Sequence, residues 1–157
     1  MKLPVNLLLT VSSKVNLWWL IILAAMAIYA CYTDCRYREI SNRLVLCMAL
    51  WTLSRMEFHG ETQHLLHPVA VLLFGGVLFQ MNILAAGDSK LFAALSLAID
   101  SQFLAITLLL IGFLGGVLAI SQWWLGRMTA DIRWTQRGVP YAVPICLASL
   151  LAIAASL

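Results

Sequence analysis

Apolar stretches alternate with short polar segments along almost the whole chain. The first apolar stretch follows a mixed leader at residues 1–16, and most polar segments are only long enough to be turns between helices. A run of about 20 apolar residues can cross the hydrocarbon core of a bilayer as a helix. The pattern therefore predicts six helices, at residues 17–33, 44–58, 67–86, 91–99, 103–125 and 139–157.

The fourth of these helices is much shorter than the others. Residues 91–125 are too long for one crossing, and polar residues at 100–102 divide them in two. As a helix, residues 91–99 would extend for only about 14 Å, roughly half of a hydrocarbon core. We therefore expect this helix to be packed inside the bundle, or water to reach it at one end. The alternative is one tilted helix over 90–110 with Asp100 in mid-membrane, which is costly for an unpaired carboxylate.

The composition agrees with an integral membrane protein. The chain is 62% hydrophobic and 11% charged, whereas soluble domains carry about 25% charged residues. We expect an all-α polytopic fold in a single transmembrane domain over 1–157. The four cysteines form no C-x-x-C pair, which excludes a zinc ribbon. Neither a metal nor a cofactor is expected, and the net charge of +3 does not indicate a nucleic-acid partner.

The basic residues predict the orientation in the membrane, because cytoplasmic loops of membrane proteins are enriched in Lys and Arg. With six spans and the N-terminus outside, the inner segments hold more of them than the outer segments. The inner ones are Arg36, Arg38, Arg43, Lys90, Arg127, Arg133 and Arg137, and the outer ones are Lys2, Lys14 and Arg55. This orientation places Asp34 and Asp88 at the cytoplasmic ends of helices.

Asp34 and Asp88 are therefore candidates for an acid–base pair. One ionised carboxylate takes a proton from water, and the other, protonated, polarises a peptide carbonyl. Two close carboxylates share one proton, because they do not both ionise cheaply. Asp88 opens a helix, whose positive dipole end favours an anion, and Asp34 closes one. The sequence thus favours Asp88 as the base and Asp34 as the acid.

The residues around Asp88 have a functional and a purely structural interpretation. Gly87 would allow a positive φ and the close approach of a substrate strand. Lys90 would steady the Asp88 anion, or extend to lipid headgroups. The structural alternative is that Asp88 is an ordinary helix N-cap. Small residues at Gly75-Gly76 and the Gly112/Gly116 step are expected where helices approach closely.

The stretches around Asp34 and Asp88, together with a third at 140–145, resemble the motifs of type IV prepilin leader peptidases. These are membrane aspartyl proteases of the Gly-x-Gly-Asp kind. The family pattern D-x-R-x-x-x-I-P-N is D-C-R-Y-R-E-I-S-N at 34–42. The pattern G-x-G-D-x-K-L is A-A-G-D-S-K-L at 85–91. A weaker match, P-Y-x-x-x-I, opens the last helix at 140–145. The chain looks most like the short, peptidase-only members associated with tight-adherence (Flp) pili.

The resemblance implies that Asp34 and Asp88 are catalytic, and that Gly87, Lys90, Arg36 and Asn42 support the site or the substrate. It implies a bacterial inner-membrane enzyme that cleaves prepilins, which carry a basic leader before a hydrophobic helix, at the cytoplasmic face. Larger members carry an additional domain with C-x-x-C pairs and methylate the product, and we expect no such activity here. Ser41 and Ala85 replace a Pro and a Gly of the family patterns.

Two other functions use the same features. A proton-relay or transport protein would also need membrane-embedded acids, but its polar groups would be spread through the membrane depth. A non-catalytic membrane protein of a pilus or secretion assembly would tolerate the Ala85 departure. Cleavage of a co-expressed prepilin, lost on substitution of either Asp, separates the three.

Overall fold

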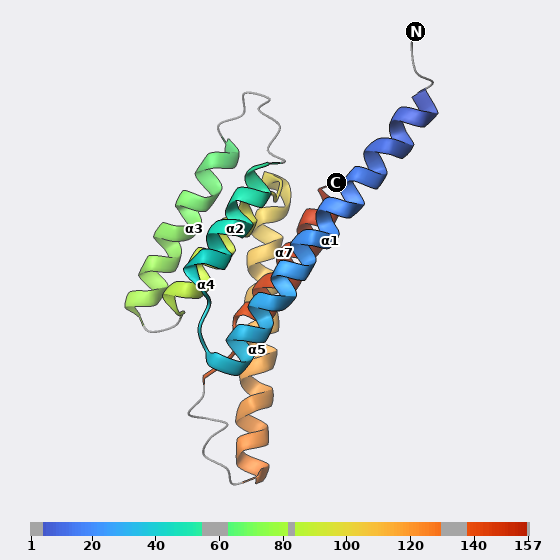
Figure 1. Ribbon diagram of the computed structural model, residues 1–157. Coiled ribbons are helices and arrows are strands. Elements are labelled where there is room, and N and C mark those ends of the chain that lie inside the picture. Colours follow the sequence, from blue (N-terminus) through green and yellow to red (C-terminus); the bar gives the residue numbers. More distant parts are fainter. Residues whose placement is uncertain (1–4, 55–62, 82–83, 130–137, 157) are drawn as a thin grey trace.

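The computed structural model describes residues 5–54, 63–81, 84–129 and 138–156 (Figure 1). These residues form helices and contain no strand. The helices are α1 (Val5–Tyr37), α2 (Asn42–Leu53), α3 (Gln63–Gln80), α4 (Ala86–Ser96), α5 (Ser101–Thr129) and α7 (Ala142–Ala155). The all-α class and the short fourth helix are therefore confirmed. The loop at His59 and the basic loop at Asp131 lie outside the described residues.

Several predicted helix limits were wrong. α1 begins at Val5 and has 33 residues, so that part of the expected leader belongs to the first helix. α3 already ends at Gln80. The alternative of one helix over 90–110 is also wrong, because the chain leaves the helical conformation between α4 and α5. There, the backbone N–H of Asp100 donates a 3.3 Å hydrogen bond to Ser156 Oγ.

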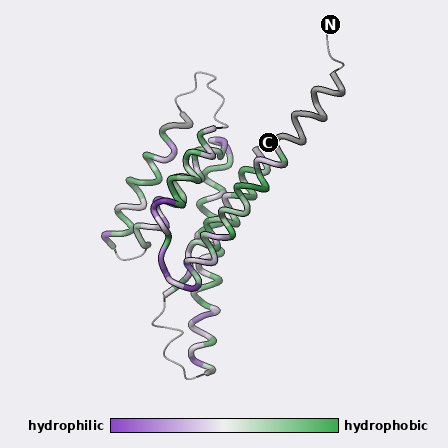
Figure 2. The backbone as a smooth tube through the Cα atoms, in the orientation of Figure 1, coloured by the Kyte–Doolittle hydropathy of each residue, from purple (hydrophilic) through white to green (hydrophobic). Residues whose placement is uncertain are grey.

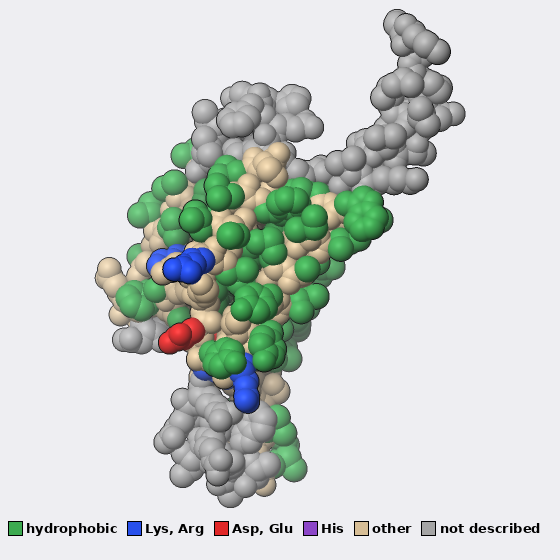
Figure 3. All heavy atoms as spheres, in the orientation of Figure 1, with side chains coloured by type: hydrophobic (Ala, Val, Ile, Leu, Met, Phe, Trp, Pro, Cys, Tyr) green, Lys and Arg blue, Asp and Glu red, His purple; other side chains and the backbone are tan. Residues whose placement is uncertain are grey.

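Two of the described helical segments are long and apolar enough to cross a membrane. They are Leu17–Tyr37 and Ser101–Met128. Shorter apolar segments lie at Asn42–Leu53, Leu66–Gln80 and Ala142–Ala155. Large apolar side chains are exposed over much of the surface, as Figure 3 shows for one face. Such a surface is rare on soluble monomers and indicates a membrane or a protein partner.

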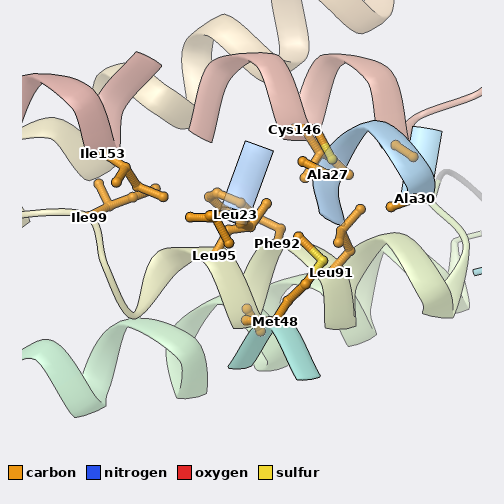
Figure 4. Close-up of a cluster of buried hydrophobic side chains, with 14 of the residues drawn as sticks. Leu23, Ala27, Ala30, Met48, Leu91, Phe92, Leu95, Ile99, Cys146 and Ile153 are labelled. Carbon is orange, nitrogen blue, oxygen red and sulfur yellow. The ribbon is translucent and has the colours of Figure 1, made fainter. Parts of the chain in front are cut away.

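The short helix α4 is the centre of the bundle. It packs against α2, α3 and α7, and every residue from Leu91 to Ser96 is buried. Leu91 and Leu95 contribute to a hydrophobic cluster with Leu23 of α1 and Met48 of α2 (Figure 4). A helix surrounded in this way does not need to span a bilayer alone, which explains why an 11-residue helix suffices.

Polar contacts fix α2 against both α1 and α4. The Nε1–H of Trp19 donates to the carbonyl of Trp51, and the Nε1–H of Trp51 donates to that of Trp19, both at 3.2 Å. The two rings are stacked with centroids 6.4 Å apart. The hydroxyl of Thr52, the next residue of α2, donates a 2.9 Å hydrogen bond to the carbonyl of Ala94 in α4. These bonds orient α2, whose first residue is Asn42.

Glycines bring two pairs of helices into close contact. A Cβ at Gly75 would overlap the side chain of Ser89, so α3 can approach α4 only with glycine there. A Cβ at Gly115 would lie 2.7 Å from Cε1 of Tyr141, next to α7. Gly112 and Gly116 have nothing within 4 Å of an added Cβ. The expectation that the Gly112/Gly116 step packs against a helix was wrong, since the contact is made by Gly115.

Candidate active site

The candidate site lies where the end of α1 meets the beginnings of α4 and α7. Asp34 is in the last turn of α1, Asp88 is in the first turn of α4, and Ala142 begins α7. The polar connection between α1 and α2 borders the same region and is drawn in purple in Figure 2. Residues far apart in the sequence therefore meet at one end of the bundle.

Asp34 and Asp88 line one cavity of about 280 Å³. Both are buried, with 7% and 5% of their surfaces exposed. Burial of a carboxylate is unfavourable unless hydrogen bonds or positive charges stabilise it, or it binds a proton. The other lining residues are Arg38, Glu39, Ile40, Asn42, Ala85, Gly87 and Lys90. Two carboxylates in one hollow, with room for a peptide bond and water, are what acid–base hydrolysis requires.

Asp34 is held by the beginning of α7. The backbone N–H of Ala142 donates a 3.1 Å hydrogen bond to Oδ2 of Asp34. The first N–H groups of a helix have no partner within the helix, and the N-terminus carries a partial positive charge. The contact therefore satisfies one of these groups and stabilises negative charge on Asp34. Sequence reasoning did not identify this partner, although the weak P-Y match at 140–145 marked the segment.

Asp88 lies in the polar turn that precedes the apolar stretch of α4. Burial and, after it, the nearby negative charge of Asp34 raise its pKa from 3.8 to about 7. A backbone hydrogen bond involving Ala85 and the positive charge of Arg38 oppose this rise in the pKa. Asp88 therefore exchanges its proton near neutral pH, the range in which a general acid or base is most useful.

Arg38 borders the candidate site, although sequence reasoning assigned it only to the membrane topology. It lines the cavity, and its charge acts on Asp88. Its φ of 58° is in the left-handed region, which costs a non-glycine residue about 1–2 kcal/mol. Its backbone N–H bonds to the carbonyl of Asp34 at 2.9 Å, as in the left-handed termination of many helices. This turn ends α1 and places the guanidinium beside the carboxylates.

The structure changes the interpretation of Gly87 and of the Ala85 departure. Gly87 lines the cavity, but it is helical and does not have the expected positive φ. A Cβ there would lie 3.6 Å from Cβ of Ile40, an ordinary contact. Ala85 has φ −76° and ψ 148°, a conformation that alanine adopts freely. The Gly-to-Ala departure therefore causes no backbone strain.

Ser41 departs from the family pattern in a similarly harmless way. It precedes α2 with φ −64° and ψ 128°. A proline ring fixes φ near −65°. Serine thus adopts the φ angle that a proline would impose at this position.

The remaining predicted site residues divide into two groups. Lys90 and Asn42 line the cavity, and Lys90 Nζ donates a 3.2 Å hydrogen bond to Asn42 Oδ1. Arg36 is exposed and is not among the lining residues. In the described part of the chain, no cluster of three or more His, Cys, Asp or Glu side chains is arranged to hold a metal ion.

Comparison with known protein families identifies the family of the chain. A model of the type IV leader peptidase family matches residues 21–120. No curated protein and no solved structure matches the chain. The matched region covers more than half of the chain and contains both Asp34 and Asp88. The chain therefore belongs to the type IV leader peptidase family.

Proposed function

We propose that the protein is a membrane aspartyl endopeptidase that removes the leader peptide of Flp-like prepilins at the cytoplasmic face of the bacterial inner membrane. Membership of a peptidase family supports proteolysis. The observation that carries the aspartyl mechanism is that Asp34 and Asp88, from different helices, are buried together in one cavity. The proton-relay alternative is less favoured, since these acids meet at one end of the bundle.

In this mechanism the two carboxyl groups share one proton. The anion takes a proton from water as the water attacks the scissile carbonyl, and the protonated carboxyl donates its proton to the carbonyl oxygen. We assign the anion to Asp34, since the Ala142 N–H stabilises negative charge there. The raised pKa of Asp88 suits it as the proton donor at neutral pH. This reverses the assignment expected from the helix ends alone.

Helix dipoles suggested the opposite roles because only the helix of each residue was considered. Asp34 does lie at the unfavourable end of α1, but the N-terminus of α7 faces it. Asp88 does lie at the favourable end of α4, but its burial outweighs that effect. Since the two groups interact, the pair titrates with shared rather than private pKa values.

The proposed topology has six spans and the N-terminus outside. The apolar segments of α1 and α5 support spanning, and the exposed apolar side chains suit contact with lipid. The excess of Lys and Arg in the segments predicted to lie on the same side of the membrane as Asp34 and Asp88 supports a cytoplasmic location for the site. Glu39 lines the cavity and offers a negative charge to a basic leader.

The proposal is tested by co-expression with a prepilin-like substrate that carries a basic leader before an apolar segment. The wild type is expected to shorten the substrate, and Asp34→Ala and Asp88→Ala are expected to leave it intact. Asp100→Ala is the matched control, because this carboxylate lies beyond the far end of α4, and it is expected to retain cleavage. An uncut substrate with wild-type enzyme in the same membrane would favour a non-catalytic assembly role.

A further inference from the structure

A second hollow lies beside the catalytic cavity. It is a groove of about 340 Å³ along α4, with one wall from α2 and the other from α3. Ala93 and Ala94 of α4 form its floor, and Ala49 of α2 and Leu72 of α3 contribute to its walls. α2 and α3 both pack against α4, and the small alanine side chains leave the space between them open. Apart from two polar residues, only apolar side chains line the groove.

These two polar residues connect the groove with the catalytic cavity. Asn42 and Lys90 line both hollows, and they are joined by the 3.2 Å hydrogen bond from Lys90 Nζ to Asn42 Oδ1. On one side of this pair the lining carries Asp34 and Asp88, and on the other side it is apolar. A chain that passes over the pair therefore moves directly from the carboxylates into an apolar environment.

We infer that the groove binds the apolar segment that follows the scissile bond of the substrate, as a helix lying along α4. This inference rests on the proposed function. From Lys90 to Leu97 the groove follows α4 for about 10 Å, or two helical turns. Helices commonly bind by inserting side chains at i, i+3, i+4 and i+7 into an apolar groove. The basic leader stays on the side of the carboxylates, where Glu39 offers a negative charge.

The Asn42–Lys90 pair lies where the substrate helix must begin. A peptide bond inside a helix has its carbonyl in a hydrogen bond, so the scissile bond has to lie outside the helix. The first N–H groups of the substrate helix then lack partners and need acceptors. Asn is among the side chains that best accept from such groups, and Asn42 Oδ1 is at the groove entrance. Lys90 supplies donors for the carbonyls of the extended segment.

Photocrosslinking tests the location of the substrate helix. A photoreactive amino acid is placed at Leu72, which lines the groove, or at Leu73, which does not. Both side chains are exposed, 45% and 69% respectively, so the control is the more accessible of the two. In full-length Asp88→Asn protein, which keeps the substrate uncut, position 72 is expected to crosslink the apolar segment and position 73 is not. Equal crosslinking at both, or crosslinking only to lipid, would overturn the inference.

Kinetics with two substrates test the contribution of the groove to catalysis. One substrate has the complete apolar segment, and the other is cut short after the first few residues beyond the scissile bond. Ala49→Phe fills the groove, so that one side chain of the long substrate can no longer be buried there. The variant is expected to lower the ratio of kcat/KM for the long substrate to kcat/KM for the short substrate about tenfold. Ala105→Phe, on an exposed face of α5, is expected to leave this ratio unchanged.

The outcomes distinguish a failure of the groove proposal from a failure of the proposed peptidase function. Wild-type enzyme that cleaves neither substrate contradicts the proposed function itself. Enzyme that cleaves both, with the same ratio in wild type and Ala49→Phe, leaves the peptidase intact and overturns the groove. If Ala49→Phe fails to fold, the crosslinking comparison at Leu72 and Leu73 still decides, because both positions are on the surface.

Discussion

The backbone N–H of Ala142 is 3.1 Å from Oδ2 of Asp34, so the last helix is bonded to a carboxylate 108 positions earlier in the chain. This bond makes α7 part of the candidate active site. This bond stabilises negative charge on Asp34, whereas burial and the nearby charge of Asp34 raise the pKa of Asp88 to about 7.

Cleavage is expected to fall as the pH rises through about 7. The pKa of Asp88 is raised to about 7, so the carboxyl is protonated below this pH and loses its proton above it. If Asp88 is the proton donor, kcat/KM measured from pH 4 to 9 on purified enzyme has its upper limb near 7. A rate that continues to increase from pH 7 to 9 would contradict this role.

The same pKa predicts how stability depends on pH. The folded-state pKa of Asp88 is higher than the unfolded value of 3.8, so the native state keeps a proton that the unfolded chain releases between these values. The stability that the Asp88 carboxyl contributes is therefore present below about pH 4 and is lost as the pH rises towards 7. In the wild type, this titration lowers the free energy of unfolding by at most about 1.4 kcal/mol for each pH unit. Asp88→Asn removes this dependence on pH. Thermal unfolding in detergent at pH 4.5 and 8 should show Asp88→Asn gaining stability relative to wild type at the higher pH.

Arg38→Gln is expected to move the upper limb of the pH profile to higher pH. The positive charge of Arg38 holds the pKa of Asp88 below the value that burial and Asp34 would otherwise produce. Removing this charge therefore raises the pKa of Asp88 further. Arg36→Gln is the control, because Arg36 is exposed and does not line the cavity. Equal shifts in the two variants would mean that only the general charge of the loop matters.

Gly75→Ala is expected to destabilise the fold by about 1–3 kcal/mol, a typical cost of overpacking. Its Cβ would overlap Ser89 in the first turn of α4, so activity should decrease together with stability. Gly76→Ala is matched in residue type and helix, but has nothing within 4 Å of the added Cβ. It should be neutral or stabilise the protein, because alanine favours helix more than glycine does. Thermal unfolding of both variants measures the difference.

Much of the architecture could be predicted from the order of apolar and polar stretches. The break between residues 91–99 and 103–125 predicted a short buried helix, and α4 is this helix. The limits of α1 were missed because its backbone hydrogen bonds continue beyond the apolar stretch. The end of α3 was missed because its backbone hydrogen bonds stop before the apolar stretch does. Glycine spacing suggested Gly112 and Gly116, but only Gly115 faces Tyr141, and spacing alone does not determine which face of a helix has a neighbour.

The carboxylates of the site could be found from the sequence, while their surroundings could not. Asp34 and Asp88 each stand at the end of an apolar stretch, where a charged side chain is costly. The Ala142 contact is made by a backbone group, so it leaves no side-chain signal. Arg38 reaches the cavity because of its left-handed φ, which nothing in the sequence D-C-R-Y-R indicates. The family resemblance therefore implied Arg36, whereas the tertiary structure brings Arg38 to the cavity.

The most direct test of the account is the cleavage rate of Asp34→Asn, Asp88→Asn and the double variant, measured with purified protein and one prepilin substrate. Two carboxyl groups that share a proton act as a unit, and removing both then costs no more than removing either. Each single variant is expected to lose about a thousandfold or more in kcat. The double variant is expected to lose no more than the single variants do. Substantial cleavage by either single variant, or losses that multiply in the double variant, would contradict the shared site of Asp34 and Asp88.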